Sequence, residues 1–379
     1  MSGQKLKVMH ILSVLGFGGT EYGVVKLLNN LDPDRFDCSI VSLSQIKPDI
    51  ETLVEPHVKL YCVPKEGKYN YRGIMNLVML ARRNNVDIVH THNWATYFYG
   101  FCMAVCIRGL ALVHGEHGRD QCEWILPRKR YYLLKLFTMR TKQLIAVTKD
   151  IRDSMVLKWK IPEPSVRIIE NGVDLDRFKL SKSVIEKKKH DIGISGDSIV
   201  IGNIGVLRDV KNHGLLFNAF KGIRGEFPNC ILLIIGDDPH GNRKEMYIKQ
   251  VEELGIAENV VFLGQRTDIP ELLGCMDIYV NMSLFEGMSN TILEAMASRL
   301  PVVASNVGGN PELVSHEVSG LLFPSGDLQG LIDALKKLLL HKELRIRMAE
   351  RGHETIMSKH SLDKMIKENM EVYERVLHR

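Results

Sequence analysis

The feature that most constrains this chain is an alternation of short β-branched segments with amphipathic helical segments, which runs twice along its 379 residues. In the first half, strands are predicted at KVMHIL, CSIVSL, VKLYCV, DIVHTH, LIAVT and VRIIE. In the second half, they are predicted at IVIGNIGVL, ILLIIGD, VVFLG, IYVNMS, PVVAS and GLLF. Such alternation predicts parallel sheets covered by helices, and a chain longer than roughly 300 residues is expected to divide. We therefore predict an α/β protein with two doubly wound, Rossmann-like domains.

The domain boundaries are predicted from a charged segment in the middle of the chain. Residues 176–198, DRFKLSKSVIEKKKHDIGISGDS, lack an evident helical or strand period and are interpreted as the interdomain connection. This places an N-terminal domain at 1–175 and a C-terminal domain at 199–360. The final helical segment, 361–379, is expected to pack back on the N-terminal domain. The N-terminus alternates and ends in glycines, which predicts a first strand rather than a signal peptide.

Charge and composition exclude several classes of protein. A formal charge of +5, with acidic and basic residues interspersed, gives no nucleic-acid footprint. The seven cysteines include no CxxC pair, which predicts reduced thiols in a cytoplasmic protein. The longest apolar run, 94–107, is too short to span a bilayer and predicts a buried helix.

In open parallel sheets, ligands bind beyond the carboxyl ends of the strands, so the loops there are searched first. Residues 15–25, LGFGGTEYGVV, place Gly18 and Gly19 after a strand, before a helix that Thr20 can cap. Their N–H groups suit a phosphate. The dinucleotide fingerprint GxGxxG is not met, because Glu21 stands at the third glycine position. A tight turn without a ligand is the alternative.

Residues 113–120, VHGEHGRD, end another strand with a dense group of polar side chains. Here His117 offers a hydrogen-bond donor or a general acid or base. The HxxH spacing of His114 and His117 leaves a zinc site open, and a histidine that steadies a turn is the third interpretation.

Residues 202–214, GNIGVLRDVKNHG, follow the first strand of the second half. Two cations, Arg208 and Lys211, stand beside a predicted helix N-terminus near Asn212. This pattern predicts a diphosphate clamp. Solvated surface charge is the alternative for either residue.

Residues 284–305, LFEGMSNTILEAMASRLPVVAS, carry two carboxylates eight positions apart, Glu286 and Glu294. The apolar stripe of the helix leaves Glu294 on the opposite face, toward water or a ligand. A capping box formed with Thr291 would explain Glu294 without any ligand. An acid and nucleophile of a glycosidase is disfavoured, because hydrolysis needs no phosphate-binding features. The N–H groups of the residues after Glu286 are candidates for binding an anion: Gly287, Met288, Ser289 and Asn290.

Several segments together resemble the family 4 retaining glycosyltransferases of the GT-B fold, over nearly the whole chain. They are NGVDLDRF (171–178), the Lys211 loop, FEGMSNTILEAMASRLPVVAS and GGNPELV (308–314). HGEHGRD with VKNH is similar to a bacterial subgroup associated with exopolysaccharide synthesis. The resemblance implies two Rossmann-like domains that face a central cleft.

The resemblance also implies roles for the site residues. Glu294 would hold the ribose hydroxyls of a nucleotide-sugar donor, Glu286 would lie beside the transferred sugar, and His117 would sit near the reacting carbon. Lys211 would neutralise the diphosphate as the glycosyl bond breaks. The implied reaction is a retaining transfer, with a UDP-sugar favoured, to a glycan or lipid-linked acceptor in polysaccharide biosynthesis. No metal or other cofactor is expected, because no Asp-x-Asp motif follows a strand.

One departure from the family pattern concerns the phosphate loop. Valine, Val206, occupies the position where the family carries arginine, and Arg208 two residues later replaces it or Lys211 acts without it. Ser289 stands where proline is commoner. The alternatives that remain are a non-catalytic homologue that binds nucleotide-sugars or glycans, and a nucleotide-sugar 2-epimerase.

The acceptor side is predicted from residues 122–140, CEWILPRKRYYLLKLFTMR, which mix basic with aromatic and aliphatic residues. This composition is compatible with a helix on the inner surface of the cell membrane, beside a lipid-linked acceptor. An ordinary domain helix with a solvated basic face is the alternative.

Overall fold

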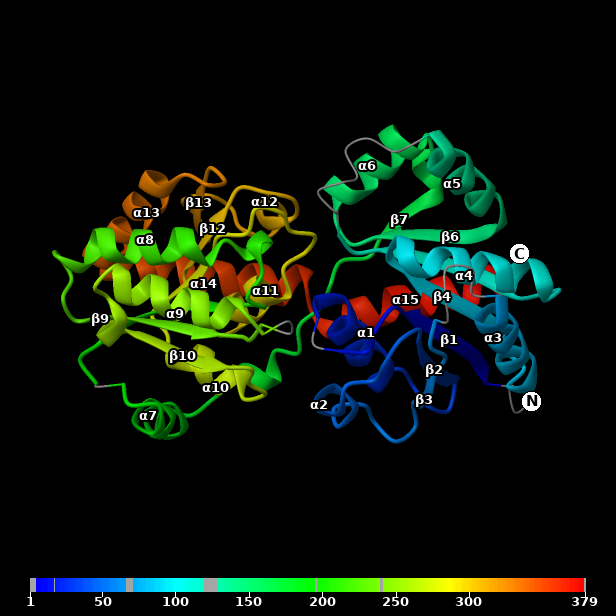
Figure 1. Ribbon diagram of the computed structural model, residues 1–379, viewed down its shortest axis with the longest axis horizontal. Coiled ribbons are helices and arrows are strands. Elements are labelled where there is room, and N and C mark those ends of the chain that lie inside the picture. The colour runs from blue at the N-terminus through cyan, green and yellow to red at the C-terminus, as the bar shows by residue number, and fades with distance from the viewer. Residues whose placement is uncertain are drawn as a thin grey trace. The chain divides into compact units, whose positions relative to one another are not determined.

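The computed structural model describes residues 5–16, 18–65, 71–118, 128–194, 196–238 and 241–377, without the side chains of 128–130. The chain forms two compact units, one of Met1–Asn171 with Leu362–Arg379 and one of Gly172–Ser361. Each unit contains a parallel sheet with helices on both faces (Figure 1). This confirms the predicted α/β class with two doubly wound sheets.

The sheet of the first unit has the order β3-β2-β1-β4-β5-β6-β7. Its strands are β1 (Leu6–Leu12), β2 (Phe36–Ser42), β3 (Lys59–Cys62), β4 (Ile88–His92), β5 (Ala111–Glu116), β6 (Thr141–Ala146) and β7 (Val166–Ile168). Its helices are α1 (Gly19–Asn29), α2 (Pro48–Glu51), α3 (Tyr71–Arg83), α4 (Asn93–Cys106), α5 (Arg128–Arg140), α6 (Lys149–Trp159), the 3₁₀ turn η2 (Glu163–Ser165) and α15 (Leu362–Leu377). The strand order reverses between β1 and β4, so ligands are expected at their carboxyl ends.

The sheet of the second unit repeats the pattern in the order β10-β9-β8-β11-β12-β13. Its strands are β8 (Ile199–Ile204), β9 (Cys230–Ile235), β10 (Val260–Gly264), β11 (Ile278–Asn281), β12 (Val302–Ser305) and β13 (Gly320–Phe323). Its helices are α7 (Lys182–Asp191), α8 (His213–Arg224), α9 (Arg243–Glu253), α10 (Ile269–Gly274), α11 (Asn290–Ala297), α12 (Asn310–Leu313), α13 (Leu328–Leu340) and α14 (Lys342–Lys359), with 3₁₀ turns η3 (Asp176–Phe178), η4 (Asp209–Lys211) and η5 (Ala257–Asn259). The reversal lies between β8 and β11.

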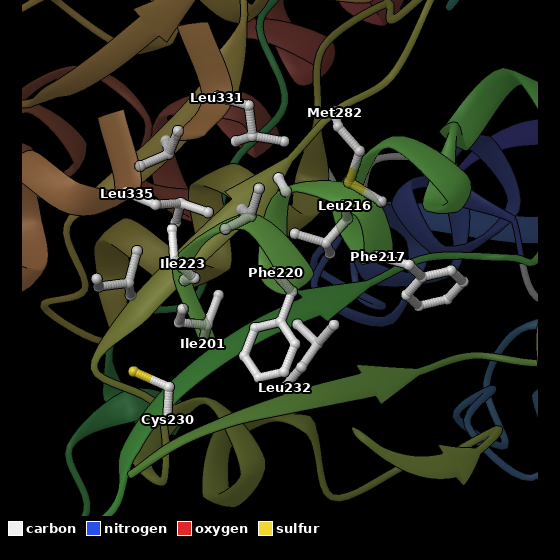
Figure 2. Packing of buried hydrophobic residues seen from close by; sticks show 14 of the residues in the cluster. Ile201, Leu216, Phe217, Phe220, Ile223, Cys230, Leu232, Met282, Leu331 and Leu335 are labelled. Atoms are coloured by element: carbon white, nitrogen blue, oxygen red, sulfur yellow. The ribbon is translucent and has the colours of Figure 1, made fainter. Parts of the chain in front are cut away.

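The core of the second unit explains why its strands read as almost continuous apolar runs. Both faces of a parallel sheet are covered, so both sets of side chains are buried. On one face, Phe220 and Ile223 of α8 pack with Leu232 of β9, and Leu331 and Leu335 of α13 complete the cluster (Figure 2). Full burial of each such side chain contributes about 1.5 to 3 kcal/mol.

The last helix, α15, returns to the first unit. It packs against α1 and β6, and its buried residues, among them Met365, Val372 and Tyr373, belong to the core of that unit. The chain leaves the second unit just before, where Val173 and Ser361 form an isolated parallel bridge.

Two sequence interpretations of local structure are wrong. The segment 176–198 is not an irregular connection, because it contains η3 and α7 and lies inside the second unit. Ser181 caps α7, Lys188 forms an ion pair with Asp268 at 2.8 Å, and the Ile185 side chain packs beside Gly274. The helix at 94–107 exists as α4, but it is not buried all round, since Phe98 is 45% and Val105 58% exposed. Within the described ranges, no helix is both long enough and apolar enough to cross a membrane.

Candidate active site

An ion pair stands at the β8/β11 switch point of the second unit. Lys211 Nζ lies 2.7 Å from Glu286 Oε2, and these side chains are 27% and 12% exposed. Lys211 ends η4 and is followed by Asn212, whose left-handed φ of 52° turns the chain into α8. The structure therefore brings together two predicted site residues that are far apart in sequence.

A second predicted cation, Arg208, lies three residues before Lys211. Arg208 is exposed and forms no ion pair with any residue within the described ranges. Its neighbour Asp209 is held by Arg243, whose Nε and Nη2 lie 3.1 and 2.6 Å from the carboxylate oxygens. The loop is thus anchored through Asp209, which leaves the guanidinium of Arg208 available to an anionic ligand.

The loop that carries Glu286 is braced by two neighbouring loops. Leu284 N–H donates to the Val210 carbonyl at 2.8 Å, and Gly309 N–H donates to the Gly287 carbonyl at 2.9 Å. A Cβ on Gly308, which has a φ of 51°, would lie 1.8 Å from the carbonyl oxygen of Glu286. Only glycine fits there, and this explains the first part of the GGNPELV segment.

The N-terminus of α11 differs from the sequence expectation in two ways. Ser289, not Thr291, is the N-cap, with its hydroxyl accepting from Ile292 N–H at 3.4 Å. Glu294 does not lie on a solvent-facing side, because it is only 8% exposed. Burial raises the pKa of Tyr279, and the negative charges of Glu286 and Glu294 raise it further, so both carboxylates lie near that phenol. The predicted anion-binding stretch is itself mostly covered: Met288, Ser289 and Asn290 are buried and Gly287 is half-buried.

Sequence reasoning missed a buried amide network beneath these loops. Asn310 Nδ2 donates to Asn281 Oδ1 at 3.3 Å and to the Ser305 carbonyl at 3.0 Å. Asn281 in turn donates to Ser289 Oγ at 3.3 Å, and Ser305 Oγ donates to the Ser283 carbonyl at 2.6 Å. Asparagines that immediately end strands, or follow glycines after them, were the available signal, because such amides can fix the loops they face.

In the first unit, His117 lies just beyond β5. Its backbone N–H donates to Asn93 Oδ1 at 3.0 Å, and its ring Nε2 lies 2.8 Å from His92 Nδ1. Desolvation lowers the pKa of His117 to about 4, so the ring is neutral at physiological pH. Asn93, which the sequence analysis did not single out, has a left-handed φ of 61° at the start of α4.

The proposed zinc pair of the HxxH segment is not assembled. His114 lies against Thr91, Glu116 and the ring of Tyr97, whereas His117 contacts His92. Arg119 and Asp120 of the same segment lie outside the described residues.

The glycine loop after β1 has an acidic neighbour. Gly18 is the N-cap of α1 and Gly19 its first residue, so Thr20 does not cap the helix. A Cβ on Gly18 would lie 2.1 Å from Glu21 Oε2. A phosphate at this helix N-terminus would therefore meet a carboxylate already facing it.

Another group of histidines lies inside the first unit, at the β1/β4 switch point. One nitrogen from each of His10, His90 and His92 lies within 4.8 Å of the others, a spacing compatible with a metal ion. Most of these nitrogens are already hydrogen-bonded within the protein, as described below. Beside them is a cavity of about 40 Å³, lined in part by His90, His92, Gly115 and His117.

Known proteins match both units. Residues 17–177 match the family described as Glycosyltransferase Family 4, and residues 184–355 match the family described as Glycosyl transferases group 1. The chain belongs to the family 4 glycosyltransferases. Its two doubly wound sheets are those of the GT-B fold, as predicted.

This glycosyltransferase is similar to several curated relatives. It is 26% identical to the UDP-Gal:alpha-D-GlcNAc-diphosphoundecaprenol alpha-1,3-galactosyltransferase of Escherichia coli, over 90% of each chain. It is 27% identical to the N-acetyl-alpha-D-glucosaminyl L-malate synthase of Bacillus anthracis, over 88% of this chain and 86% of that protein. The putative glycosyltransferase EpsF of Bacillus subtilis is 25% identical, over 81% and 80%.

Solved structures share the fold of this glycosyltransferase. HepE from Anabaena, in complex with UDP-glucose, superimposes with a TM-score of 0.86 at 21% identity, and covers 98% of this chain and 100% of its own. A glycosyltransferase from Rickettsia africae superimposes with a TM-score of 0.85 at 20% identity, over 99% of each chain.

Proposed function

We propose that this glycosyltransferase moves a sugar from a UDP-sugar to a glycan or lipid-linked acceptor, with retained configuration, in polysaccharide biosynthesis. The observation that carries the proposal is the Lys211–Glu286 ion pair beside buried Glu294 at the β8/β11 switch point. Among the relatives, the Escherichia coli enzyme is named for UDP-Gal and a diphosphoundecaprenol acceptor, which supports both halves of the proposal.

Binding of the nucleotide-sugar would replace the Lys211–Glu286 ion pair by new contacts between the protein and the ligand. Lys211 Nζ would leave Glu286 and form an ion pair with the β-phosphate. The exposed Arg208 would add a second positive charge beside the diphosphate. Released from the ion pair, the Glu286 carboxylate would accept hydrogen bonds from the sugar hydroxyls. Glu294, largely withdrawn from water, would accept hydrogen bonds from the two ribose hydroxyls.

Retention would follow from attack on the same face that the nucleotide leaves. The bond between the anomeric carbon and the phosphate oxygen breaks, and the acceptor oxygen bonds to that carbon from the same side. The departing phosphate oxygen takes the acceptor's proton. Lys211 and Arg208 would carry the negative charge of the leaving diphosphate, so the rate is expected to survive removal of divalent cations.

Val206 favours one other function, that of a non-catalytic homologue binding nucleotide-sugars. Valine at this position removes the cation that the family pattern supplies, and the exposed Arg208 two residues later would then be a surface residue. The two functions differ in whether nucleoside diphosphate is released.

A panel of donors tests the proposed function. We expect purified protein to release UDP slowly from one UDP-sugar without acceptor, to release no diphosphate from GDP- or ADP-sugars, and to be unaffected by EDTA. The release is measured by coupling free nucleoside diphosphate to an optical assay. Binding of a UDP-sugar without turnover across a broad acceptor panel would instead favour the non-catalytic homologue.

A surface of the first unit fits the proposed lipid-linked acceptor. Of the seventeen exposed large hydrophobic side chains within the described ranges, nine lie on α3, α4 and α5. We call them the outer apolar face: Tyr71, Met75, Met79, Phe98, Val105, Tyr132, Leu133, Leu136 and Met139. α4 packs against both of the other helices, and none of the three contains an aspartate or glutamate.

The charges around this face also suit an anionic lipid surface. Exposed Arg82 and Arg83 end α3, Arg108 follows α4, and Lys135 and Arg140 lie on α5. Exposed apolar and basic side chains on the same helices are typical of surfaces that lie in the headgroup region, where each basic residue contributes about 1 kcal/mol. Residues 122–127 of the basic segment lie outside the described residues.

Replacing Leu136 and Met139 by glutamate is expected to weaken binding to phosphatidylglycerol vesicles by at least about a hundredfold. Two apolar side chains that would insert into the membrane are lost, and two negative charges then face the anionic lipid surface. Co-sedimentation measures the effect. The matched control is Met246→Glu with Leu340→Glu, because these side chains are similarly exposed on the second unit. Equal loss in both double variants, or loss in neither, would refute the membrane contact.

A further inference from the structure

A continuous chain of hydrogen bonds runs from His117 into the core of the first unit. His92 Nδ1 lies 2.8 Å from His117 Nε2, and His92 Nε2 lies 2.8 Å from His10 Nδ1. The hydroxyl of Tyr373, on α15, lies 3.0 Å from His10 Nε2 and 2.9 Å from His90 Nδ1. Strand register explains the cluster, because His10 pairs with His90 across β1 and β4, and His92 follows on the same face.

Each member of this chain has one proton to contribute. Desolvation lowers the pKa values of His10, His90 and His92 well below the usual range, and burial raises that of Tyr373 well above it. All the rings are therefore neutral, and each imidazole has one N–H and one lone pair. His10 and His92 each use both nitrogens within the chain, so each must accept on one side and donate on the other. All the hydrogen bonds of this series therefore point the same way, either from His90 toward His117 or from His117 toward His90.

The end of the chain at His90 decides which direction that is. His90 Nε2 is fully buried and has no hydrogen-bond partner among the described residues. A buried N–H without an acceptor is rarer in proteins than a buried acceptor without a donor, so the His90 proton belongs on Nδ1. His90 then donates to Tyr373, Tyr373 to His10, His10 to His92, and His92 to His117 Nε2.

We propose that Tyr373, acting through His10 and His92, holds His117 in the tautomer that carries its proton on Nδ1. No residue within the described ranges accepts a hydrogen bond from this nitrogen. His117 would therefore present an N–H donor and not a base to whatever binds there. The role of this N–H group in sugar transfer rests on the proposed function. There, an oxygen of the nucleotide-sugar or of the acceptor would accept its hydrogen bond. Tyr373, His10 and His92 are positioning residues, since none of them need touch substrate.

A metal ion is the competing explanation of the same histidines. Ligands of a tetrahedral zinc ion share one ion at about 2.0 to 2.1 Å and cannot hydrogen-bond to one another through the same nitrogens. Here, His10 and His92 have both nitrogens paired with other chain members at 2.8 to 3.0 Å. The geometry is that of hydrogen bonds, and bound zinc is an outcome that the experiment below can detect.

The tautomers can be measured directly. In protein labelled with ¹⁵N-histidine, long-range ¹H–¹⁵N correlation spectra distinguish a protonated from an unprotonated ring nitrogen, and His117→Gln assigns the signals. We expect His117 to carry its proton on Nδ1. In Tyr373→Phe we expect a mixture of both tautomers and about a tenfold fall in the rate of UDP release, the effect of one neutral hydrogen bond. The control is Tyr97→Phe, which removes a buried hydroxyl that bonds Thr141 and no chain member.

The outcomes separate the hypotheses. His117 protonated on Nε2 in the unmodified protein would overturn the proposal, and that measurement stands even if Tyr373→Phe does not fold. An unchanged tautomer in folded Tyr373→Phe, or stoichiometric zinc in the purified protein, would also overturn it. Absence of UDP release from any donor, with the expected tautomer present, would refute the proposed function and leave this inference intact.

Discussion

Lys211→Ala is expected to reduce UDP release by about a thousandfold. Removal of one preorganised donor to a developing oxyanion typically costs a factor of 10² to 10³, and Lys211 would supply a full positive charge to the leaving diphosphate. The turnover number should fall more than the Michaelis constant rises, because charge builds on the diphosphate in the transition state. Steady-state kinetics with the identified UDP-sugar measure both quantities.

Two other variants make this result specific. Lys336→Ala is the matched control, since it removes a half-buried lysine that pairs with an exposed carboxylate, Glu226, on the same unit. Exposed pairs contribute at most about 1 kcal/mol, so its rate should be unchanged. Arg208→Ala tests whether the free arginine compensates for valine at position 206. Lys211→Ala that keeps most of its rate, joined to an inactive Arg208→Ala, would move the leaving-group role to Arg208.

Glu294→Ala is expected to weaken binding of UDP by about a hundred- to ten-thousandfold. A carboxylate that accepts two hydroxyl hydrogen bonds gains about 1.5 to 3 kcal/mol from each, and Glu294 is only 8% exposed. Isothermal titration with UDP measures the loss. Glu294→Gln, which keeps the shape and one acceptor oxygen, should lose less.

Deoxy ligands identify the contact itself. The unmodified protein should bind 2′-deoxy-UDP and 3′-deoxy-UDP more weakly than UDP, and Glu294→Ala should bind all three about equally. Persistence of the full preference for ribose in Glu294→Ala would place the ribose contact on another residue. A lowered thermal midpoint without any change in affinity would mean that Glu294 serves packing only.

The fold was predictable because the apolar periodicity and the alternation of strands with helices along the chain suffice for it. Each predicted strand is present, and loops after strands are where the candidate residues lie. Lys211 and Glu286 could be proposed from type and position, since both follow strands next to the β8/β11 reversal. Their ion pair could not be foreseen, because it depends on how the loop bearing Glu286 is held by Gly308 and Leu284.

The failures have physical causes in tertiary packing. A helical wheel puts Glu294 opposite the apolar stripe, but α11 is only eight residues long and is buried at every position except Thr291, because α10, α12, α14 and two strands pack against it. The capping-box pattern at Thr291 was outcompeted by Ser289, whose extended backbone conformation suits an N-cap. The helix α7 was missed because its composition is highly charged. Its stabilising contacts, with Asp268 and Gly274, are long-range and cannot be read from the local sequence.

The histidine chain was beyond local reasoning for a further reason. Residues 10, 90, 92 and 117 are scattered along the sequence, and only parallel pairing of β1 with β4 brings the first three together. Tyr373 comes from the opposite end of the chain. Sequence signals for such a cluster exist only once the strand order is known.

The return of α15 to the first unit has a consequence for biosynthesis. Tyr373 and Val372 are fully buried in a core whose members outside α15 all precede residue 172. The ribosome must therefore make all of Gly172–Ser361 before that core can be completed, which takes roughly 10 to 40 seconds at 5 to 20 residues per second. The nascent first unit waits through this interval with an uncovered apolar surface, and a premature stop within Gly172–Ser361 leaves that surface uncovered permanently. We therefore expect chaperone dependence and sensitivity to C-terminal truncation in the half of the protein that is synthesised first.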